Sequence, residues 1–207
     1  GAFSAQAEGL VTSFREQEDY DGFKMACILN FGLDTSITQD ELLKADESKL
    51  IDRLYQEAIV SYAHHKQEVE KQAIPVFKNI RLTQGANIEN VIVPFTDGRK
   101  GYNVLANLTK TLDTGGVELS QALERSVTLA VIDENWKEHL RAMDDLKQSV
   151  QTAYLEQKDP LVIYKMEAYQ LFRNMNADVN RNIVNFLCHA TLPTQQQEAG
   201  LREGRQQ

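Results

Sequence analysis

The chain has 207 residues, 42% of them hydrophobic and 25% charged, which is the make-up of a globular protein with one large domain or two small ones. Its 30 acidic and 22 basic side chains give a net charge of −8, which argues against a nucleic-acid-binding module because such a module needs a basic face. No apolar run approaches the ~18 residues of a membrane-spanning helix, and a start without Met or a signal sequence indicates a piece of a longer protein.

The N-terminal region is predicted to be helical. Residues 4–19 and 21–31 are expected to form two short helices, with a break at 20–22 where a glycine follows a tyrosine and an aspartate. Residues 1–46 carry 9 acidic and 3 basic side chains, and we interpret this charge as a solvated helical face.

A capping signal and a long periodic pattern follow. Thr38 and Glu41 have the spacing of a capping box, so a short helix should run through about Ala45. From Glu47 onward, apolar residues recur every three or four positions, which predicts one face of a long helix. Pro75 can kink or end that helix because it has no N–H to donate to the preceding turn.

Residues 88–107 change from helical periodicity to two runs rich in β-branched residues. Asp97-Gly98 lies between these runs, and this dipeptide adopts the positive φ that a hairpin turn needs. Pro94 fits only an edge strand, since it cannot donate a ladder hydrogen bond. We therefore expect a small β-hairpin inserted in a helical protein.

The most regular pattern of the chain comes after this hairpin. Apolar residues recur at helical spacing from Leu123 to Val150, and a break is expected at about 152–158. Asp159 and Pro160 then supply an N-cap and a proline for the first helical position of a second long helix. Two long amphipathic helices joined by a short loop predict an antiparallel two-helix hairpin.

The sequence therefore predicts a mainly α fold in three parts. A helical subdomain with the inserted β-hairpin is expected over 1–116, and the long two-helix hairpin over 117–192. The polar, Gln-rich segment 193–207 is expected to be a disordered tail.

No catalytic or metal-binding motif is present in the sequence. It lacks a phosphate-binding loop and a metalloprotease motif, and its adjacent acids and its His64-His65 pair would diverge on a helix. Cys27 and Cys188 lie far apart among apolar neighbours, so we expect two buried free thiols and no disulfide. The sequence thus predicts that this region is not an enzyme and holds no cofactor or metal.

Two groups of apolar residues in the two-helix hairpin are candidates for contacts. Trp136, Leu140 and Met143 share a helical stripe, which indicates packing against another part of a scaffold. Tyr154 and Leu155 lie in the connecting loop at the far end of the helices. They either tuck back to seal the helical hairpin or form a tip that contacts a partner.

Two long sequence blocks identify a family resemblance. Residues 132–144 read I-D-E-N-W-K-E-H-L-R-A-M-D, and residues 157–165 read Q-K-D-P-L-V-I-Y-K. Together they resemble the C-terminal part of the SecA family, the ATP-driven motors of bacterial protein export. The resemblance is tight over 120–187 and looser over 9–78, and the segment around 79–116 looks like a lineage-specific insertion.

The resemblance implies a helical wing domain followed by the two-helix finger of the helical scaffold domain. In that family the finger tip faces the SecYEG channel and contacts the translocating polypeptide, and the same element restrains the motor ATPase. The family tip commonly reads R-G-Y-A-Q-K-D-P, whereas residues 153–160 read A-Y-L-E-Q-K-D-P. The tyrosine of the family tip thus aligns with Leu155, and Tyr154 lies one place earlier. Lys158 aligns with the lysine of the family tip. The resemblance therefore implies a tip contact at these three residues.

The resemblance also implies partners and a location. The partners would be the SecYEG channel, unfolded preproteins and the nucleotide-binding domains of the same motor, with homodimerisation left open and no nucleic acid. The motor would be cytoplasmic and peripheral at the inner membrane. ATP and magnesium would bind to the parent protein upstream of Gly1, and its zinc motif would lie past Gln207, so this region would hold none of them.

A second class of function stays open beside this one. A stand-alone helical adaptor could use the two-helix hairpin as a dimerisation arm, since such a hairpin has spare apolar surface to cover. A metal or small-molecule enzyme would need inward-facing carboxylates and histidines that the pattern lacks.

Overall fold

A computed structural model describes residues 1–84, 88–150 and 159–193. The chain is mainly helical with one two-stranded antiparallel sheet, as the sequence predicts. The elements in chain order are α1 (Ala2–Glu16), α2 (Tyr20–Phe31), α3 (Gln39–Lys44), α4 (Glu47–Gln84), β1 (Asn90–Thr96), β2 (Gly101–Asn107), α5 (Leu108–Asp113), α6 (Val117–Val150) and α7 (Pro160–His189).

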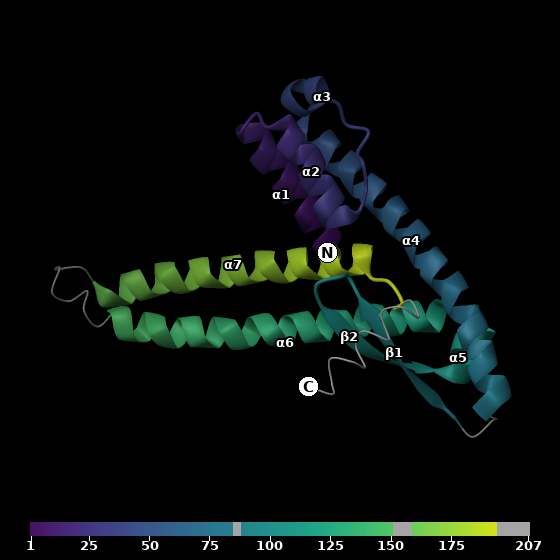
Figure 1. Cartoon of the computed structure of the whole chain (residues 1–207). Coiled ribbons are helices and arrows are strands. Elements are labelled where there is room, and N and C mark those ends of the chain that lie inside the picture. The colour runs from purple at the N-terminus through teal and green to yellow at the C-terminus, as the bar shows by residue number, and fades with distance from the viewer. Residues whose placement is uncertain (85–87, 151–158, 194–207) are drawn as a thin grey trace, which may run out of the picture.

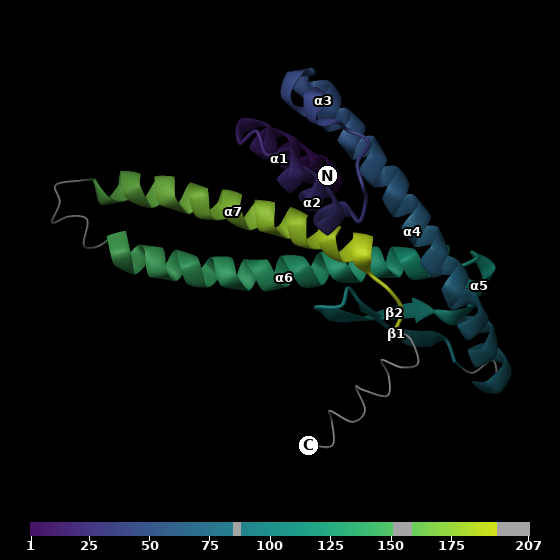
Figure 2. The ribbon, with the colours of Figure 1, turned by 45° about the horizontal axis from the view of Figure 1, so that its top comes forward.

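Helices α6 and α7 lie side by side along most of their length and form a long rod (Figure 1). Helices α1 and α2 pack against α7 on one side of the rod, α3 lies beyond them, and the β-hairpin packs against α6 on the opposite side (Figure 2). Helix α4 runs past one end of the rod and connects these two groups. The opposite end of the rod projects away from the rest of the molecule.

The two N-terminal helices form as predicted, but the position of their break was wrong. The break falls at residues 17–19, and the residues expected to interrupt the chain form the first turn of α2. Asp19 explains the difference, because its side chain accepts a hydrogen bond from the Gly22 N–H at 2.9 Å and caps the helix. Glu18 has a positive φ of 53°, which turns the chain between the helices. The cap thus outweighs the low helix propensity of Gly22.

The capping box at Thr38 is confirmed, and so is the short helix α3 that follows it. Pro75, in contrast, does not end α4, which continues to Gln84. Pro75 faces solvent, while Ala73 and Phe77 on either side of it are each only 1% exposed. Packing of the buried face therefore keeps the chain helical at Pro75, although the proline cannot donate a backbone hydrogen bond to the preceding turn.

The predicted β-hairpin is confirmed. Asn90 pairs with Asn107 and Thr96 with Gly101, and Pro94 lies opposite Asn103 in a sheet whose two strands are both edge strands. Residues on the two strands alternate between buried and exposed positions, so one face packs on the molecule and the other faces solvent. Helix α5, which begins at the end of β2, was not predicted.

The buried apolar residues form two clusters. The first joins α4, the β-hairpin, α5, the start of α6 and the end of α7. The second joins α1, α2, the loop that follows α2, α4 and again the end of α7. Ile183, Phe186 and Leu187 face the first cluster, and Val184 and Cys188 face the second. The last turns of α7 therefore lie between the two cores and belong to both.

Candidate functional site

The rod divides into two halves with different surroundings. We call its base residues 117–131 of α6 and 180–189 of α7, and its outer half residues 132–150 and 160–179. The base contains a run of buried apolar residues on each helix. In the outer half, Val150 is the one buried residue among those that the structure describes. The base is thus part of the protein core, and the outer half is not.

Side chains of the β-hairpin and α4 fix the base on one side. The Tyr102 ring lies edge-on to the Phe186 ring, with 4.8 Å between ring centroids. Ser120 at the start of α6 donates a hydrogen bond to the buried carboxylate of Glu70 on α4. Gly116 allows this approach, because a Cβ atom there would lie 2.8 Å from the Glu70 Cβ atom.

A polar cluster joins the base to the middle of α4. Glu124 accepts hydrogen bonds from the Tyr62 hydroxyl and the Lys66 ammonium group, both at 2.9 Å. Burial of the Tyr62 ring raises the pKa of its hydroxyl, and the neighbouring Glu124 carboxylate raises it further. Tyr62 therefore stays a hydrogen-bond donor. His65 on the same helix lies 2.8 Å from the carbonyl oxygen of Ala190, just after α7 ends.

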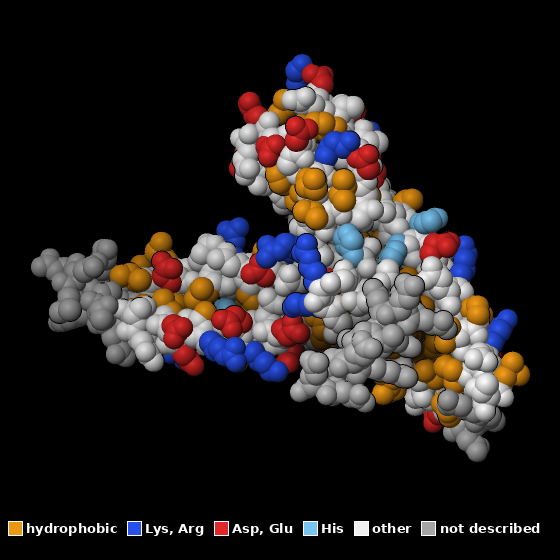
Figure 3. Space-filling view, in the orientation of Figure 1, with side chains coloured by type: hydrophobic (Ala, Val, Ile, Leu, Met, Phe, Trp, Pro, Cys, Tyr) orange, Lys and Arg blue, Asp and Glu red, His pale blue; other side chains and the backbone are white. Residues whose placement is uncertain are grey.

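An exposed apolar stripe runs along α6 from the end of the base into the outer half. Its four residues recur every three or four positions and therefore lie on one face of the helix. Their exposed fractions are 68% for Leu129, 45% for Ile132, 46% for Trp136 and 49% for Leu140. We call these residues the α6 stripe. Figure 3 shows apolar side chains at the surface of the projecting part of the rod.

Neighbouring aromatic rings extend the stripe towards α7. The Trp136 and His139 ring centroids lie 5.5 Å apart, and those of His139 and Phe172 lie 6.1 Å apart. Phe172 is itself 47% exposed. The polar faces of α6 carry ion pairs one turn apart, such as Lys137 with Asp133, as expected for solvated acidic residues.

The sequence-predicted contact residues fall into two groups. Trp136, Leu140 and Met143 lie on the outer half of the rod, and the first two keep about half of their surface exposed, so their scaffold-packing role stays a prediction. Tyr154, Leu155 and Lys158 of the tip lie outside the described residues. The Asp159 cap and the Pro160 start of α7 next to that segment are confirmed.

Both cysteines are buried and free, as predicted. Burial raises the pKa of each thiol to about 12, so both stay protonated and are poor nucleophiles. Within residues 1–84, 88–150 and 159–193, no three His, Cys, Asp or Glu side chains are grouped to hold a metal ion. None of the helices described has the length and apolar character needed to cross a membrane.

Comparison with known proteins decides the family. Residues 3–191 match the family described as "SecA Wing and Scaffold domain". The chain belongs to the SecA family. The translocase subunit SecA of Cytophaga hutchinsonii is 42% identical over 97% of the chain, and the corresponding subunit of Christiangramia forsetii is 39% identical over 91%. The chain spans 18% and 17% of the lengths of these two SecA subunits.

The match assigns the chain to the wing and scaffold region of SecA, a part of a protein translocase. Sequence reasoning found the periodic residues of the rod but missed the cluster of Tyr62, Lys66 and Glu124. No local signal marks that cluster, since its members lie 62 and 58 positions apart along the chain. It also could not distinguish the buried base from the exposed outer half, because both halves have the same apolar spacing.

Proposed function

We propose that this wing and scaffold region is a non-catalytic, mechanical part of a SecA-like ATP-driven preprotein translocase. In this proposal the rod is the two-helix finger, which contacts the SecYEG channel and the translocating polypeptide and regulates the ATPase of the motor. ATP and magnesium act in the nucleotide-binding domains of the parent protein. The motor works on the cytoplasmic side, peripheral at the inner membrane.

One observation carries this proposal. The base of the rod is buried in both apolar clusters, whereas the outer half projects and exposes Ile132, Trp136 and Leu140 of the α6 stripe. A rod anchored in this way can transmit a force from its base to its free end, because a helix pair held over several turns resists bending. Exposed apolar side chains at such an end favour contact with another chain.

The proposed contact residues are Tyr154, Leu155 and Lys158 at the tip. The test places Tyr154→Ser with Leu155→Ser in the full-length motor and measures translocation, basal ATPase activity and stability. Loss of translocation is expected, with basal ATPase activity kept and the free energy of unfolding changed by no more than about 0.5 kcal/mol. The matched control is Val60→Ser with Leu82→Ser, two exposed apolar residues of α4, and it should translocate normally.

Two results would contradict the proposed tip contact. A stable tip variant that translocates normally would show that these side chains do not act. A loss of about 1–3 kcal/mol in stability would show that they seal the end of the rod by apolar burial. Both results leave the family assignment untouched.

A stand-alone adaptor that dimerises through the rod is the alternative, since the α6 stripe could also cover a second copy of itself. Size-exclusion chromatography of the chain combined with pull-down on the SecYEG channel separates the two. An adaptor self-associates tightly and ignores the channel. A translocase module binds the channel, and binding weakens when the tip residues are changed.

A further inference from the structure

The turn of the β-hairpin, residues 96–100, is held by hydrogen bonds among its own residues. The Asp97 Oδ1 atom accepts the backbone N–H groups of Arg99 and Lys100 at 2.8 and 2.7 Å. The Thr96 hydroxyl accepts the Gly98 N–H at 3.0 Å and donates to the Lys100 carbonyl oxygen at 2.9 Å. Because these bonds satisfy the backbone groups locally, the two ends of the turn, Thr96 and Lys100, move as one unit.

Thr96, at one end of the turn, contacts the segment that follows α7. Its N–H donates to the Thr191 carbonyl oxygen at 3.1 Å, and its carbonyl oxygen accepts the Thr191 N–H at 2.8 Å. The next hydrogen-bonded position of an antiparallel ladder in this register would place Pro94 opposite Pro193. Neither proline has an N–H to donate, so the contact stays limited to one hydrogen-bonded residue pair.

Lys100, at the other end of the turn, contacts α6. Its ammonium group lies 3.1 Å from the carboxylate of Glu134, which belongs to the first turn of the outer half. The same carboxylate lies near Tyr102: burial raises the pKa of the Tyr102 hydroxyl, and Glu134 raises it further. Val131, the last buried residue of the base, comes three positions before Glu134. The turn therefore contacts α6 where the rod leaves the core.

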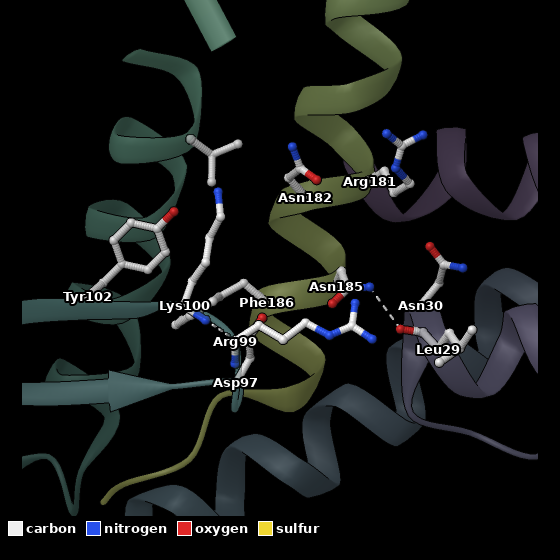
Figure 4. A pocket seen from close by; sticks show the side chains of 11 residues that line it. Leu29, Asn30, Asp97, Arg99, Lys100, Tyr102, Arg181, Asn182, Asn185 and Phe186 are labelled. Carbon is white, nitrogen blue, oxygen red and sulfur yellow. Dashed lines mark hydrogen bonds between the residues drawn. The ribbon is translucent and has the colours of Figure 1, made fainter. Parts of the chain in front are cut away.

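The two cations of the turn differ in what they contact. Figure 4 shows the Lys100 side chain extending on the side of Tyr102, and the Arg99 side chain extending the other way, towards Asn185. Within residues 1–84, 88–150 and 159–193, Arg99 makes no ion pair, whereas Lys100 pairs with Glu134. Arg99 is therefore a matched control for a change of charge at Lys100.

We propose that the hairpin turn is a releasable link between the segment after α7 and the outer half of the rod. While both contacts are made, the turn fixes the direction in which the outer half leaves the base. Lys100 and Glu134 keep 60% and 49% of their side-chain surface exposed, and the contact with Thr191 is a single residue pair. Contacts of this kind contribute little stability and open readily.

Opening of the link would free the outer half to change direction relative to the base, since apolar burial does not hold it there. Among the described residues of the outer half, only Val150 is buried. A displacement of the segment after α7 would thus be transmitted through the turn to the outer half. This inference goes beyond the proposed function, because it concerns how the rod is held and not what the rod contacts.

The test uses the 207-residue chain with charge reversals at the ion pair. Lys100→Glu and Glu134→Lys each replace attraction by repulsion, and the two together restore an ion pair. Arg99→Glu is the control, since it makes the same change of charge at the neighbouring residue. Spin labels at Val60→Cys on α4 and Gln148→Cys near the end of α6, both at exposed positions, report the direction of the outer half through the distribution of distances between them. The two native cysteines are buried, so the chain without the added cysteines gives the background labelling.

Each single charge reversal should broaden the distance distribution, and the double reversal should restore the wild-type distribution. Hydrogen exchange of the Thr191 amide reports on the other contact of the turn. It should become about three- to tenfold faster in each single reversal and recover in the double one. Arg99→Glu should leave both measurements near wild type.

Three results would overturn the proposal. Wild-type distances in both single reversals would show that the ion pair does not direct the outer half. Broadening that persists in the double reversal, or that is equally large in Arg99→Glu, would show an effect of net charge or local disruption and not of the pair. A change in the distances without a change in Thr191 exchange, or the reverse, would show that the two contacts of the turn are independent.

Discussion

The base and the outer half of the rod are built from the same two helices, yet they have different surroundings. Both halves repeat apolar residues every three or four positions. At the base, Leu119 and Val127 are fully buried, whereas Leu129 lies on another face of the same helix and is 68% exposed. The α6 stripe begins at Leu129 and stays exposed along the outer half. The difference shows that helical periodicity identifies a face that needs covering. It does not identify what covers that face.

The largest expected effect compares two phenylalanines of α7. Phe186 at the base is 3% exposed and Phe172 on the outer half is 47% exposed. Phe186→Ala should lower the free energy of unfolding by about 3–5 kcal/mol, because it removes a ring from the core and leaves a cavity. Phe172→Ala should lower it by less than about 1 kcal/mol, since its ring is half in water already.

Urea unfolding followed by circular dichroism measures both phenylalanine variants. Equal losses for the two would remove the distinction between base and outer half. A large loss at Phe172 alone would show that the outer half stabilises the fold by itself.

The second prediction tests how the base is fixed to α4. Gly116 has a φ of 102°, and a Cβ atom added there would lie 2.8 Å from Glu70. Gly116→Ala should therefore cost about 2–3 kcal/mol of stability, from backbone strain and from displacement of α4. The control is Gly115→Ala, where φ is also positive but no atom lies within 4 Å, and about 1 kcal/mol is expected there.

Thermal unfolding of the two glycine variants compares them directly. A result in which Gly115→Ala is as harmful as Gly116→Ala would mean that the positive φ, and not the contact with Glu70, fixes the start of α6.

A smaller effect is expected at the polar cluster beside the base. Tyr62→Phe removes one hydrogen bond to Glu124 and keeps the ring, so stability should fall by about 0.5–1.5 kcal/mol. Lys66 still pairs with Glu124 in this variant. Tyr55→Phe on the same helix, for whose hydroxyl the structure gives no hydrogen bond within the described residues, is the control and should change stability less. Denaturant midpoints that are equal for the two variants would show that the Tyr62 hydroxyl does not help to anchor the rod.

The smallest expected effect lies outside both halves of the rod, at the cap of α3. The Thr38 backbone N–H and the Arg53 guanidinium donate to the Glu41 carboxylate and lower its pKa from 4.5 to about 2. Because the folded-state pKa is the lower one, this contribution is complete above pH 4.5 and is lost as the pH falls towards 2.

Denaturation at a series of pH values should show the stability gap between wild type and Glu41→Gln closing across that window. The gap between the Phe186 and Phe172 variants should stay constant over the same range, since neither residue titrates. A gap between wild type and Glu41→Gln that does not change with pH would contradict the assigned cause.

Much of the fold is determined by the sequence within single elements. The capping box of Thr38 and Glu41, the Asp97-Gly98 turn and the Asp159-Pro160 start of α7 all satisfy backbone groups within a few residues. Such signals act locally, so the sequence alone places these elements. The two blocks that resemble SecA are likewise continuous stretches of the rod, which is why the family could be identified before the fold was known.

Only the tertiary structure decided the relations between elements. Packing of Phe77 keeps α4 helical past Pro75. The end of α7 packs into two cores, and the sequence of α7 does not show which of its residues face which core. The same is true of the polar cluster beside the base, whose Tyr62 and Glu124 lie 62 positions apart along the chain. Periodicity records which side of a helix is apolar. Whether that side becomes buried depends on packing between segments that lie far apart in the sequence, and this packing exists only once the chain has folded.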